Sequence, residues 1–533
     1  MQECYLRKAW VMGKVLTHCR ALITNQLNQT MSLLRSHTPD SLLVSEEQLL
    51  DYLQKCRWFA GKARQVASCG ISHQIPFGED AFWIVEVGYS EGDTEFYQLP
   101  VAHVEKLPPN STGQTLISQL DDGTILVDAI YTESFRKELY TRIFEEKTSS
   151  PESELRFRRG KGLLTEDSPD RVSSRVLPVD SSNSALIFGN NYFFKLYRKL
   201  FQLTNPEVEM VEFITENSNF RQIPAFCGSI TWRQASETDI TLGMMQRKVE
   251  ANKDNWSLTG DYLNDFLYAV PNRVFTIREE VFEQVALLGK RTGEMHLALY
   301  SPQASDAFAP EPFTDVYRRF LRQRLTHLLD SRYSLLIDKY LLLDPPTQSL
   351  AWKFMESKEL IDEFSNELLN QPLDSLRIRI HGDYHLGQVL SADNDFILID
   401  FEGEPEASIQ DRKIKHSPLK DVAGMVRSYH YAVSSKVFNS VETQNISPEK
   451  LLKVTDRWYK LMKDTYVDAY MDAIGWPHPL FKDQNEINAL MLYYLLEKAV
   501  YELGYELSYR PDWVKIPLKG IVDVIQEVEK LHG

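Results

Sequence analysis

The stretch that decides the fold runs from Arg379 to Pro405 and reads R-I-H-G-D-Y-H-L-G-Q-V-L-S-A-D-N-D-F-I-L-I-D-F-E-G-E-P. Two short apolar runs, at 389–390 and 396–399, lie on either side of a turn signal at 392–395. Apolar runs that flank a turn of this kind are typical of paired, buried strands. The sequence therefore predicts a tight β-hairpin.

Three polar side chains in this stretch have the spacing of a kinase catalytic loop. Asp383 stands five residues before Gln388, and Asp400 follows the second predicted strand. Kinases place an Asp, an Asn and the Asp of D-F-G in this way, so that one carboxylate orients and deprotonates the attacking hydroxyl while the other two groups hold magnesium on the nucleotide. We predict Asp383 as the catalytic residue and Gln388 and Asp400 as ligands of Mg²⁺, with an ordinary polar hairpin as the alternative.

Three segments of the sequence resemble one protein family. The segments H-G-D-Y-H-L-G-Q-V-L, I-D-F-E-G-E-P and S-P-L-K-D-V-A-G-M-V-R-S (417–428) are similar to the bacterial maltokinases, in the aminoglycoside-phosphotransferase branch of the kinase-like fold. Gln388 in place of Asn agrees with maltokinases. The segment R-W-F-A-G-K-A-R (57–64) resembles their N-terminal cap, although four cations around two aromatic rings also suit an anion-binding patch. The simpler interpretation places Trp58 and Phe59 in the core.

The resemblance covers about residues 41–533 and implies an α+β, bilobal, protein kinase-like fold. The expected parts are an N-terminal extension of unknown role (1–40), an N-terminal cap subdomain (41–133), a β-rich, nucleotide-binding N-lobe or intermediate subdomain (134–250), and a mostly helical C-lobe with the catalytic loop and sugar site (251–533). Ser45 with Gln48 predicts a helix cap at the start of the cap subdomain.

Composition limits the classes of function. The chain has 533 residues, 43% hydrophobic and 25% charged, with a net charge of −16. This charge argues against nucleic acid or an anionic membrane as main partner. Five cysteines without C-x-x-C spacing favour a reducing, cytoplasmic setting, and no apolar run is long enough to span a membrane.

A second predicted hairpin indicates a nucleotide site. Strands at 185–188 and 192–196 flank the turn G-N-N, and Lys195 lies on the second strand as the strand lysine of kinases does. A lysine buried there needs partners such as ATP phosphates and an acid, unless it faces solvent on an edge strand. The resemblance favours Glu209 as that acid, with Glu207 as runner-up.

Other nucleotide contacts are expected on either side. No Gly-rich loop is present, and Asp180 to Ser184 takes its place; Ser182, Asn183 and Ser184 offer hydroxyl, amide and backbone groups to phosphates. The strand at 241–249 would meet the adenine through Gln246 to Lys248. The basic segment L-R-F-R-R-G-K-G (155–162) suits a phosphate-binding surface or a solvated loop.

The acceptor site is expected on a helix near the C-terminus. Its sequence places an aromatic and charged face in a core-like helix, and such a face suits a sugar, although a packed helix with partly exposed tyrosines is the alternative. Substrate-binding candidates on the helix and near the catalytic loop are His385, Glu402, Lys498, Tyr501, Glu502 and Tyr505. His296 is expected to be structural, and Asp421 and Arg427 to bind the catalytic loop in place.

These patterns lead to three hypotheses for the function of the protein. The first is an ATP- and Mg²⁺-dependent maltokinase that phosphorylates the anomeric hydroxyl of maltose by in-line transfer. The second is an aminoglycoside-, choline- or other small-hydroxyl kinase, and the third a non-catalytic partner of a trehalose- or glycogen-metabolising enzyme. Maltokinase-like segments also occur fused to trehalose synthase, so the resemblance makes that enzyme a candidate partner, and the sequence does not decide whether the two associate.

Overall fold

The computed structural model describes residues 44–109, 111–120, 123–147, 154–178, 182–233, 239–272, 276–439, 443 and 445–532. The predicted extension at 1–40, with Asp180 of the phosphate segment, lies outside these ranges. The chain forms two compact units. Of the described residues, the first contains those within 44–141, 174–186 and 195–200, and the second those within 142–173, 187–194 and 201–532. No helix among the described residues is long and apolar enough to cross a membrane.

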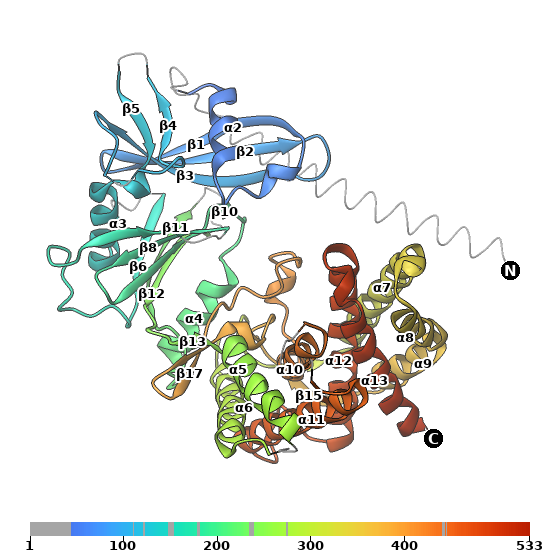
Figure 1. Ribbon diagram of the computed structural model, residues 1–533. Coiled ribbons are helices and arrows are strands. Elements are labelled where there is room, and N and C mark those ends of the chain that lie inside the picture. The colour runs from blue at the N-terminus through green and yellow to red at the C-terminus, as the bar shows by residue number, and fades with distance from the viewer. Residues whose placement is uncertain are drawn as a thin grey trace. The chain divides into compact units, whose positions relative to one another are not determined.

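The first unit is built on an antiparallel sheet, with strand order β1-β2-β3-β5-β4 and with β10 paired to β3 (Figure 1). Its strands are β1 (Val66–Phe77), β2 (Asp80–Tyr89), β3 (Glu95–Val104), β4 (Leu116–Gln119), β5 (Ile125–Asp128) and β10 (Lys199–Leu200). The helix α2 (Glu46–Lys55) begins with the predicted capping box: Gln48 N donates to Ser45 Oγ at 3.2 Å, and Ser45 N donates to Gln48 Oε1 at 2.9 Å.

The segment 57–64 belongs to the core of this unit. Trp58 and Phe59 are 4% and 2% exposed, and the Arg64 guanidinium lies 3.4 Å from the centre of the Tyr89 ring. Arg64 also donates to Glu95 at 3.0 Å, a carboxylate that Tyr89, Tyr97 and Lys199 bind as well. The core interpretation is therefore correct, because Trp58 and Phe59 are buried and Arg64 packs on the Tyr89 ring and binds Glu95.

A second sheet has the order β6-β11-β12-β9-β8-β7. Its strands are β6 (Leu155–Arg159), β7 (Ser174–Leu177), β8 (Ser184–Phe188), β9 (Tyr192–Leu196), β11 (Phe226–Arg233) and β12 (Asp239–Arg247). The predicted hairpin is present, and its turn uses Gly189 at φ +56. Because β9 is an interior strand, the edge-strand alternative for Lys195 is wrong.

The basic segment at 155–162 is not a solvated loop, because its first half forms strand β6. Two of its cations pair with acids on α4 (Pro206–Asn217): Arg158 with Glu212 at 2.5 Å and Lys161 with Glu216 at 3.1 Å. These pairs hold the edge of the sheet to the helix. They also occupy charges that a phosphate-binding surface would have used.

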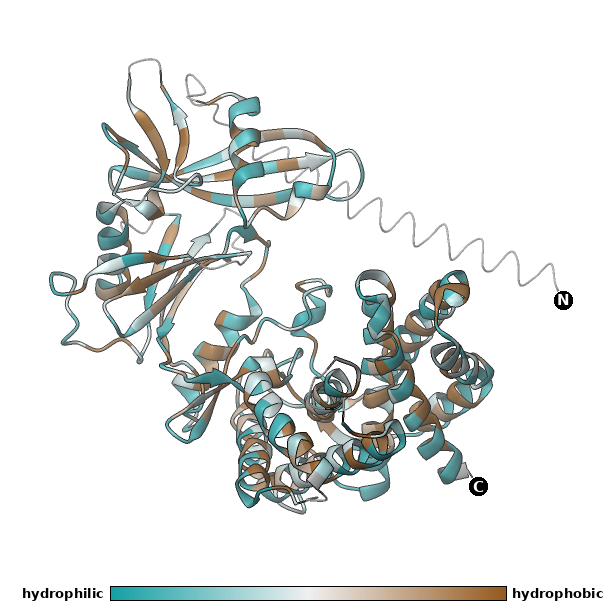
Figure 2. Ribbon diagram, in the orientation of Figure 1, coloured by the Kyte–Doolittle hydropathy of each residue, from teal (hydrophilic) through white to brown (hydrophobic). Residues whose placement is uncertain are grey.

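Helices make up most of the second unit, with apolar and polar residues alternating along them (Figures 1 and 2). They are α5 (Asn255–Ala269), α6 (Glu279–Leu299), α7 (Asp315–Lys339), α8 (Pro345–Glu356), α9 (Lys358–Asn370), α10 (Leu419–Asn439), α11 (Pro448–Ile474), α12 (Gln484–Tyr509) and α13 (Lys515–His532). α10 packs against α11 and α12, α6 packs against α11, and α7 and α13 pack against α12. Helix α3 (Glu133–Glu145) lies at the junction of the two units in sequence.

The hairpin predicted from the deciding stretch is confirmed as β16 (Val389–Ala392) and β17 (Asp395–Leu398), with β13 (Lys253–Asp254) on the other side of β16. A separate pair joins β14 (Glu311–Phe313) to β15 (Leu373–Arg377). Most strands lie in the first half of the chain and most helices in the second, which confirms the predicted α+β class.

Candidate active site

Two glycine turns bring the halves of the deciding stretch together. Gly382 has φ +88 and Gly403 has φ +79, a region that favours glycine. A Cβ atom on Gly382 would lie 3.1 Å from the Gly403 Cα. The backbone of the His381–Asp383 turn therefore runs directly against the turn that follows Asp400.

Asp421, at the start of α10, holds the catalytic turn. Its carboxylate accepts hydrogen bonds from His381 N at 2.8 Å and Gly382 N at 2.9 Å. His296 Nε2 lies 3.1 Å from the same carboxylate, and its Nδ1 lies 3.1 Å from the hydroxyl of Tyr470. Burial alone would raise the pKa of Asp421, but His296, His381 and the Gly382 amide together lower it. Asp421 and His296 thus have the structural roles predicted for them.

The catalytic candidate Asp383 pairs with a cation from α12. Lys498 Nζ donates to Asp383 Oδ1 at 3.1 Å, and each side chain is about one-fifth exposed, at 19% and 20%. Burial would lower the pKa of Lys498, whereas Asp383, Glu404 and Glu502 raise it above its usual range. Lys498 is therefore a cation at neutral pH and fixes the orientation of the Asp383 carboxylate.

The second aspartate of the stretch is held by the carboxamide. Gln388 Nε2 donates to Asp400 Oδ2 at 3.0 Å. The backbone of Asp400 has φ +67, in the left-handed region that few residues other than glycine, asparagine and aspartate adopt. The two predicted metal ligands are thus in contact with each other.

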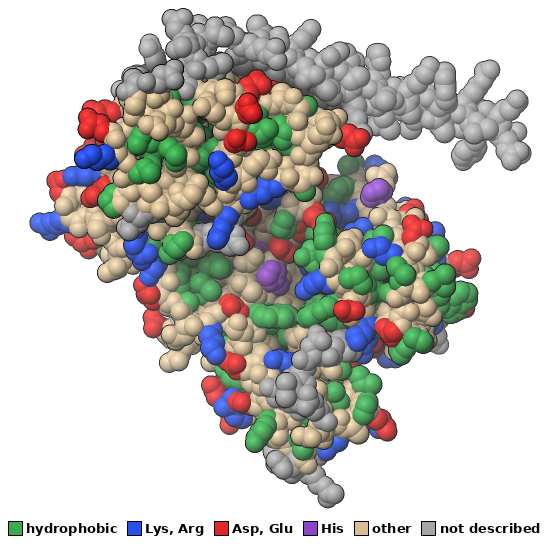
Figure 3. All heavy atoms as spheres, turned by 45° about the horizontal axis from the view of Figure 1, so that its top comes forward, with side chains coloured by type: hydrophobic (Ala, Val, Ile, Leu, Met, Phe, Trp, Pro, Cys, Tyr) green, Lys and Arg blue, Asp and Glu red, His purple; other side chains and the backbone are tan. Residues whose placement is uncertain are grey.

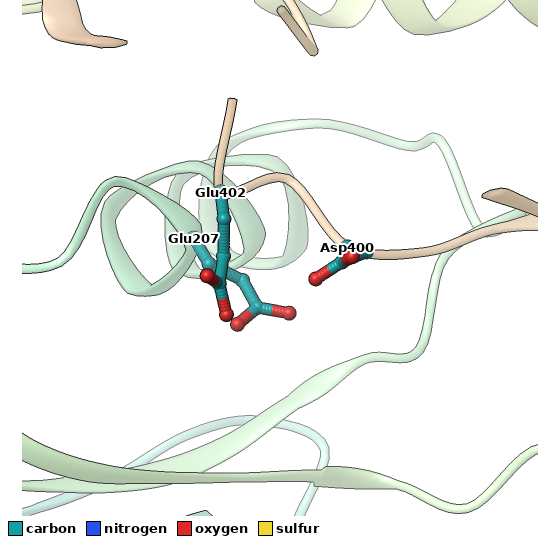
Figure 4. Close-up of side chains that lie close together, drawn as sticks. All are labelled: Glu207, Asp400 and Glu402. Atoms are coloured by element: carbon teal, nitrogen blue, oxygen red, sulfur yellow. The ribbon is translucent and has the colours of Figure 1, made fainter. Parts of the chain in front are cut away.

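Three carboxylates converge at this point (Figure 4). One oxygen from each of Glu207, Asp400 and Glu402 lies within 4.8 Å of the others. Hard divalent cations such as Mg²⁺ prefer carboxylate oxygens, so this set fits a magnesium ion. Glu207 comes from the first turn of α4, and it joins the site although the sequence indicated it only as a second choice to pair with Lys195.

Glu209, the favoured partner of Lys195, is bound in the second unit to two other cations. Arg379 donates to it at 3.1 Å and Lys413 at 2.7 Å. Glu207 and Glu209 are two residues apart, about 200° around the axis of α4, so they lie on nearly opposite faces of the helix. Lys195 itself lies on β9, half-buried, with its Nζ 5.7 Å from the centre of the Tyr197 ring.

The other residues predicted to bind the nucleotide lie on or beside strands of the second sheet. Ser184 is buried at the start of β8, where its hydroxyl accepts from Arg198 Nε at 2.8 Å; Ser182 is exposed and Asn183 half-buried. Arg198 in turn pairs with buried Asp128 at 2.5 Å. Lys248 N donates to Asn191 O at 2.8 Å, while Gln246 lies opposite Phe226 in the sheet.

The predicted aromatic and charged face of α12 divides into two parts. Lys498 and Tyr501 lie together, with the Lys498 Nζ 5.3 Å from the ring centre, and Tyr505 is 43% exposed beside Tyr509, 5.0 Å between ring centres. Glu502 instead faces α10 and binds Arg427 at 2.7 Å. Arg427 therefore anchors α12 rather than the catalytic loop. His385 accepts from Gly387 N at 3.1 Å, and burial lowers its pKa.

A polar pocket that the sequence did not indicate lies beside the catalytic turn. Gly382 and Lys498 form part of its wall, together with Arg324, Glu404, Lys420 and Glu497. Arg324 binds Glu497 at 2.5 Å and Glu404 at 2.8 Å. Burial would raise the pKa of Glu404, but Lys420, Lys498 and Arg324 outweigh it and hold that pKa well below its usual range. The pocket therefore contains carboxylates that are already paired with cations.

The comparisons with known proteins agree with this architecture. Residues 52–131 match the model of the maltokinase N-terminal cap domain. The glucosamine kinase of Mycolicibacterium smegmatis is 23% identical over 370 residues, which is 68% of this chain and 83% of that protein. The glucosamine kinase of Streptacidiphilus jiangxiensis is also 23% identical, over 67% of this chain and 74% of that protein.

A solved structure extends the likeness over nearly the whole chain. A glucosamine kinase in complex with glucosamine, ADP and inorganic phosphate superimposes with a TM-score of 0.64 and 17% identity, and covers 89% of this chain and 98% of that one. At this identity the likeness establishes the fold. The cap match confirms the predicted resemblance to maltokinases over residues 52–131, and the solved structure confirms the predicted kinase-like fold.

Proposed function

We propose that this kinase-like phosphotransferase, which carries a maltokinase-type cap domain, transfers the γ-phosphate of ATP to a sugar hydroxyl. The anomeric hydroxyl of maltose is the first candidate acceptor. The observation that carries the proposal is the arrangement around the deciding stretch: Asp383 oriented by Lys498, next to the converging carboxylates of Glu207, Asp400 and Glu402.

In the proposed reaction each of these side chains has one task. Asp383 accepts the proton of the acceptor hydroxyl and aligns its oxygen with the transferred phosphate. Lys498 keeps the Asp383 carboxylate in place, and Asp421 keeps the turn that carries it. Asp400, Glu207 and Glu402 would hold Mg²⁺, and Gln388 keeps Asp400 in position. The bound ion would neutralise charge on the phosphates.

We take the pocket beside Asp383 as the acceptor site, and its charge favours a neutral sugar over an amine. Glu404 and Glu497 are paired with Arg324, and Lys420 lies 3.4 Å from Glu404. A protonated amine there would meet the cations Lys498, Lys420 and Arg324, while Glu404 and Glu497 already have cationic partners. An amino sugar is nevertheless the second candidate, because the two relatives compared above are glucosamine kinases.

A coupled ADP-release assay tests the proposal directly. Maltose, trehalose, glucose, glucosamine and an aminoglycoside are compared at equal concentrations, with Asp383→Asn as the inactive reference and ³¹P NMR to identify the product. We expect the highest kcat/KM for maltose and an anomeric phosphate. A higher kcat/KM for glucosamine would show that the acceptor is an amino sugar, the second candidate. ADP release that no sugar stimulates would rule out a sugar kinase. Nucleotide preference and association with trehalose synthase stay predictions.

A further inference from the structure

One side of α7 presents three cations to α12. Arg324 binds Glu497 of α12, and fifteen residues further on Lys339 Nζ donates to Leu507 O at 2.6 Å. Arg332 lies between them. These two end contacts align α7 with α12, so that the residue order on both helices runs in the same direction.

Arg332 lacks the hydrogen bond to α12 that Arg324 and Lys339 make. No acid contacts it directly within the described ranges; burial lowers its pKa, and the nearby Glu406 opposes that effect. Its guanidinium lies against Gly504 of α12, where a Cβ atom would be 2.0 Å from Arg332 Nε. Nε is buried and has no hydrogen-bond partner among the described residues, while one other nitrogen, Nη1, donates to Ser331 Oγ at 3.1 Å. Because Nε is closed off from solvent against Gly504, a ligand would be bound by the two outer nitrogens of the guanidinium.

The position of Arg332 relates it to the catalytic end of α12. Lys498, Tyr501 and Gly504 follow one another at three-residue spacing and lie along one face of the helix. Lys498 touches Asp383 and Gly504 touches Arg332. With a rise of 1.5 Å per residue, Lys498 and Gly504 are separated by about 9 Å along the helix axis. This is longer than a single pyranose ring.

We propose that Arg332 binds hydroxyl groups of the second sugar unit of the acceptor, remote from the hydroxyl that Asp383 serves. It would thereby select a disaccharide over a monosaccharide. The planar guanidinium offers parallel N–H donors that match two neighbouring hydroxyls. Tyr501, between Lys498 and Gly504 in sequence, supplies a half-buried ring on the same face. The proposal rests on the proposed sugar kinase activity. It adds a residue that distinguishes a disaccharide acceptor from a monosaccharide.

Arg332→Gln tests this role through substrate choice. A hydrogen bond to a charged donor is worth enough to change kcat/KM for maltose by about 10- to 100-fold, and we expect this loss to appear in KM. The values for glucose, glucosamine and ATP should stay within about 2-fold, because none of them reaches Arg332. Arg322→Gln, on the same helix with its guanidinium on Asn370, is the matched control and should change neither sugar.

Two further variants protect the test against a folding defect. Arg332→Lys keeps the charge and the stem but removes the parallel donors, and Gly504→Ala pushes the guanidinium away; both should reproduce the selective loss for maltose. Equal losses for maltose and glucose, or no loss, would overturn the proposal. A wild-type enzyme that phosphorylates only monosaccharides would also overturn it while the kinase function stands. Failure of isothermal titration to detect maltose binding in an otherwise active kinase would do the same.

Discussion

The proposed chemistry depends on Asp383, the carboxylate that Lys498 orients at the end of the His381–Asp383 turn. Asp383→Asn keeps the shape of the side chain and removes its charge. We expect kcat to fall by about 10²- to 10⁴-fold, the usual contribution of a positioned acid–base group, while ATP still binds. Steady-state kinetics with a nucleotide-binding titration measure both quantities.

The control for this variant lies in the same hairpin. Asp393 is exposed at the turn between β16 and β17, with φ +51, so Asp393→Asn makes the same chemical change outside the site. It should keep wild-type kcat. If Asp383→Asn keeps more than about a tenth of wild-type kcat, a loss below the range for an acid–base group, then Asp383 is not the catalytic base.

Asp400 is the residue on which the proposed metal site depends. Asn tolerates the left-handed region well, so Asp400→Asn should preserve the backbone at φ +67 while it removes one of three converging carboxylates. We expect turnover to be lost and Mn²⁺ to bind the nucleotide complex more weakly, as electron paramagnetic resonance would show. Wild-type turnover of this variant at low magnesium would show that Asp400 does not bind the metal ion.

At the scale of elements, α10, α12 and α13 are joined through one buried arginine. Arg427 of α10 binds Glu502 of α12 through Nε at 3.0 Å and Nη2 at 2.7 Å, and donates from Nη1 to His430 Nδ1 at 3.0 Å. Gly520 of α13 leaves room for it: a Cβ there would lie 1.9 Å from Nη1. The glycine is thus required by a contact between helices that are distant in sequence.

Gly520→Ala should therefore destabilise the fold, although alanine favours a helix. Because three hydrogen bonds hold the guanidinium in place, we expect overpacking to cost about 1–3 kcal/mol of unfolding free energy, measured by urea denaturation. Gly260→Ala in α5 is the matched control, since its nearest foreign atoms are 3.9 Å away. That variant should be stabilised by up to about 1 kcal/mol. Equal stability of the two variants would contradict the packing argument.

For the whole molecule, buried histidines predict a loss of stability in mild acid. Burial and the neighbouring Arg427 and Lys519 hold the pKa of His430 well below its usual range, and burial with Lys420 and Arg324 does the same for His416. The unfolded chain binds a proton at each near pH 6.5, whereas the folded chain stays neutral there. Stability is therefore full above about pH 6.5 and falls as the pH drops below it.

Thermal unfolding between pH 8 and pH 5 measures this dependence. Each histidine contributes a slope of up to about 1.4 kcal/mol per pH unit below pH 6.5. His430→Asn keeps an oxygen that accepts from Arg427 and removes the titrating group, so its pH dependence should be shallower than that of the wild type. An unchanged slope in this variant would show that His430 is not a source of the acid sensitivity.

The sequence by itself determined the local parts of this protein. The hairpin, the turn residues, Lys195 on a β-strand, the capping box at Ser45 and the cap segment at 57–64 all follow from patterns within about thirty residues. Such patterns succeed because backbone geometry fixes which neighbours in sequence share a face or a turn. They placed Asp383, Gln388 and Asp400 in one segment, and the structure brings the last two into contact.

Only the tertiary structure decided which distant side chains meet. Glu207 rather than Glu209 joins Asp400, Lys498 pairs with Asp383, and Glu502 turns away to Arg427. Each choice depends on the rotation of a helix about its axis by about 100° per residue, which packing against other helices sets. Arg324 and Arg332 show the same limit, because their partners on α12 lie more than 170 residues away and leave no local pattern in the sequence.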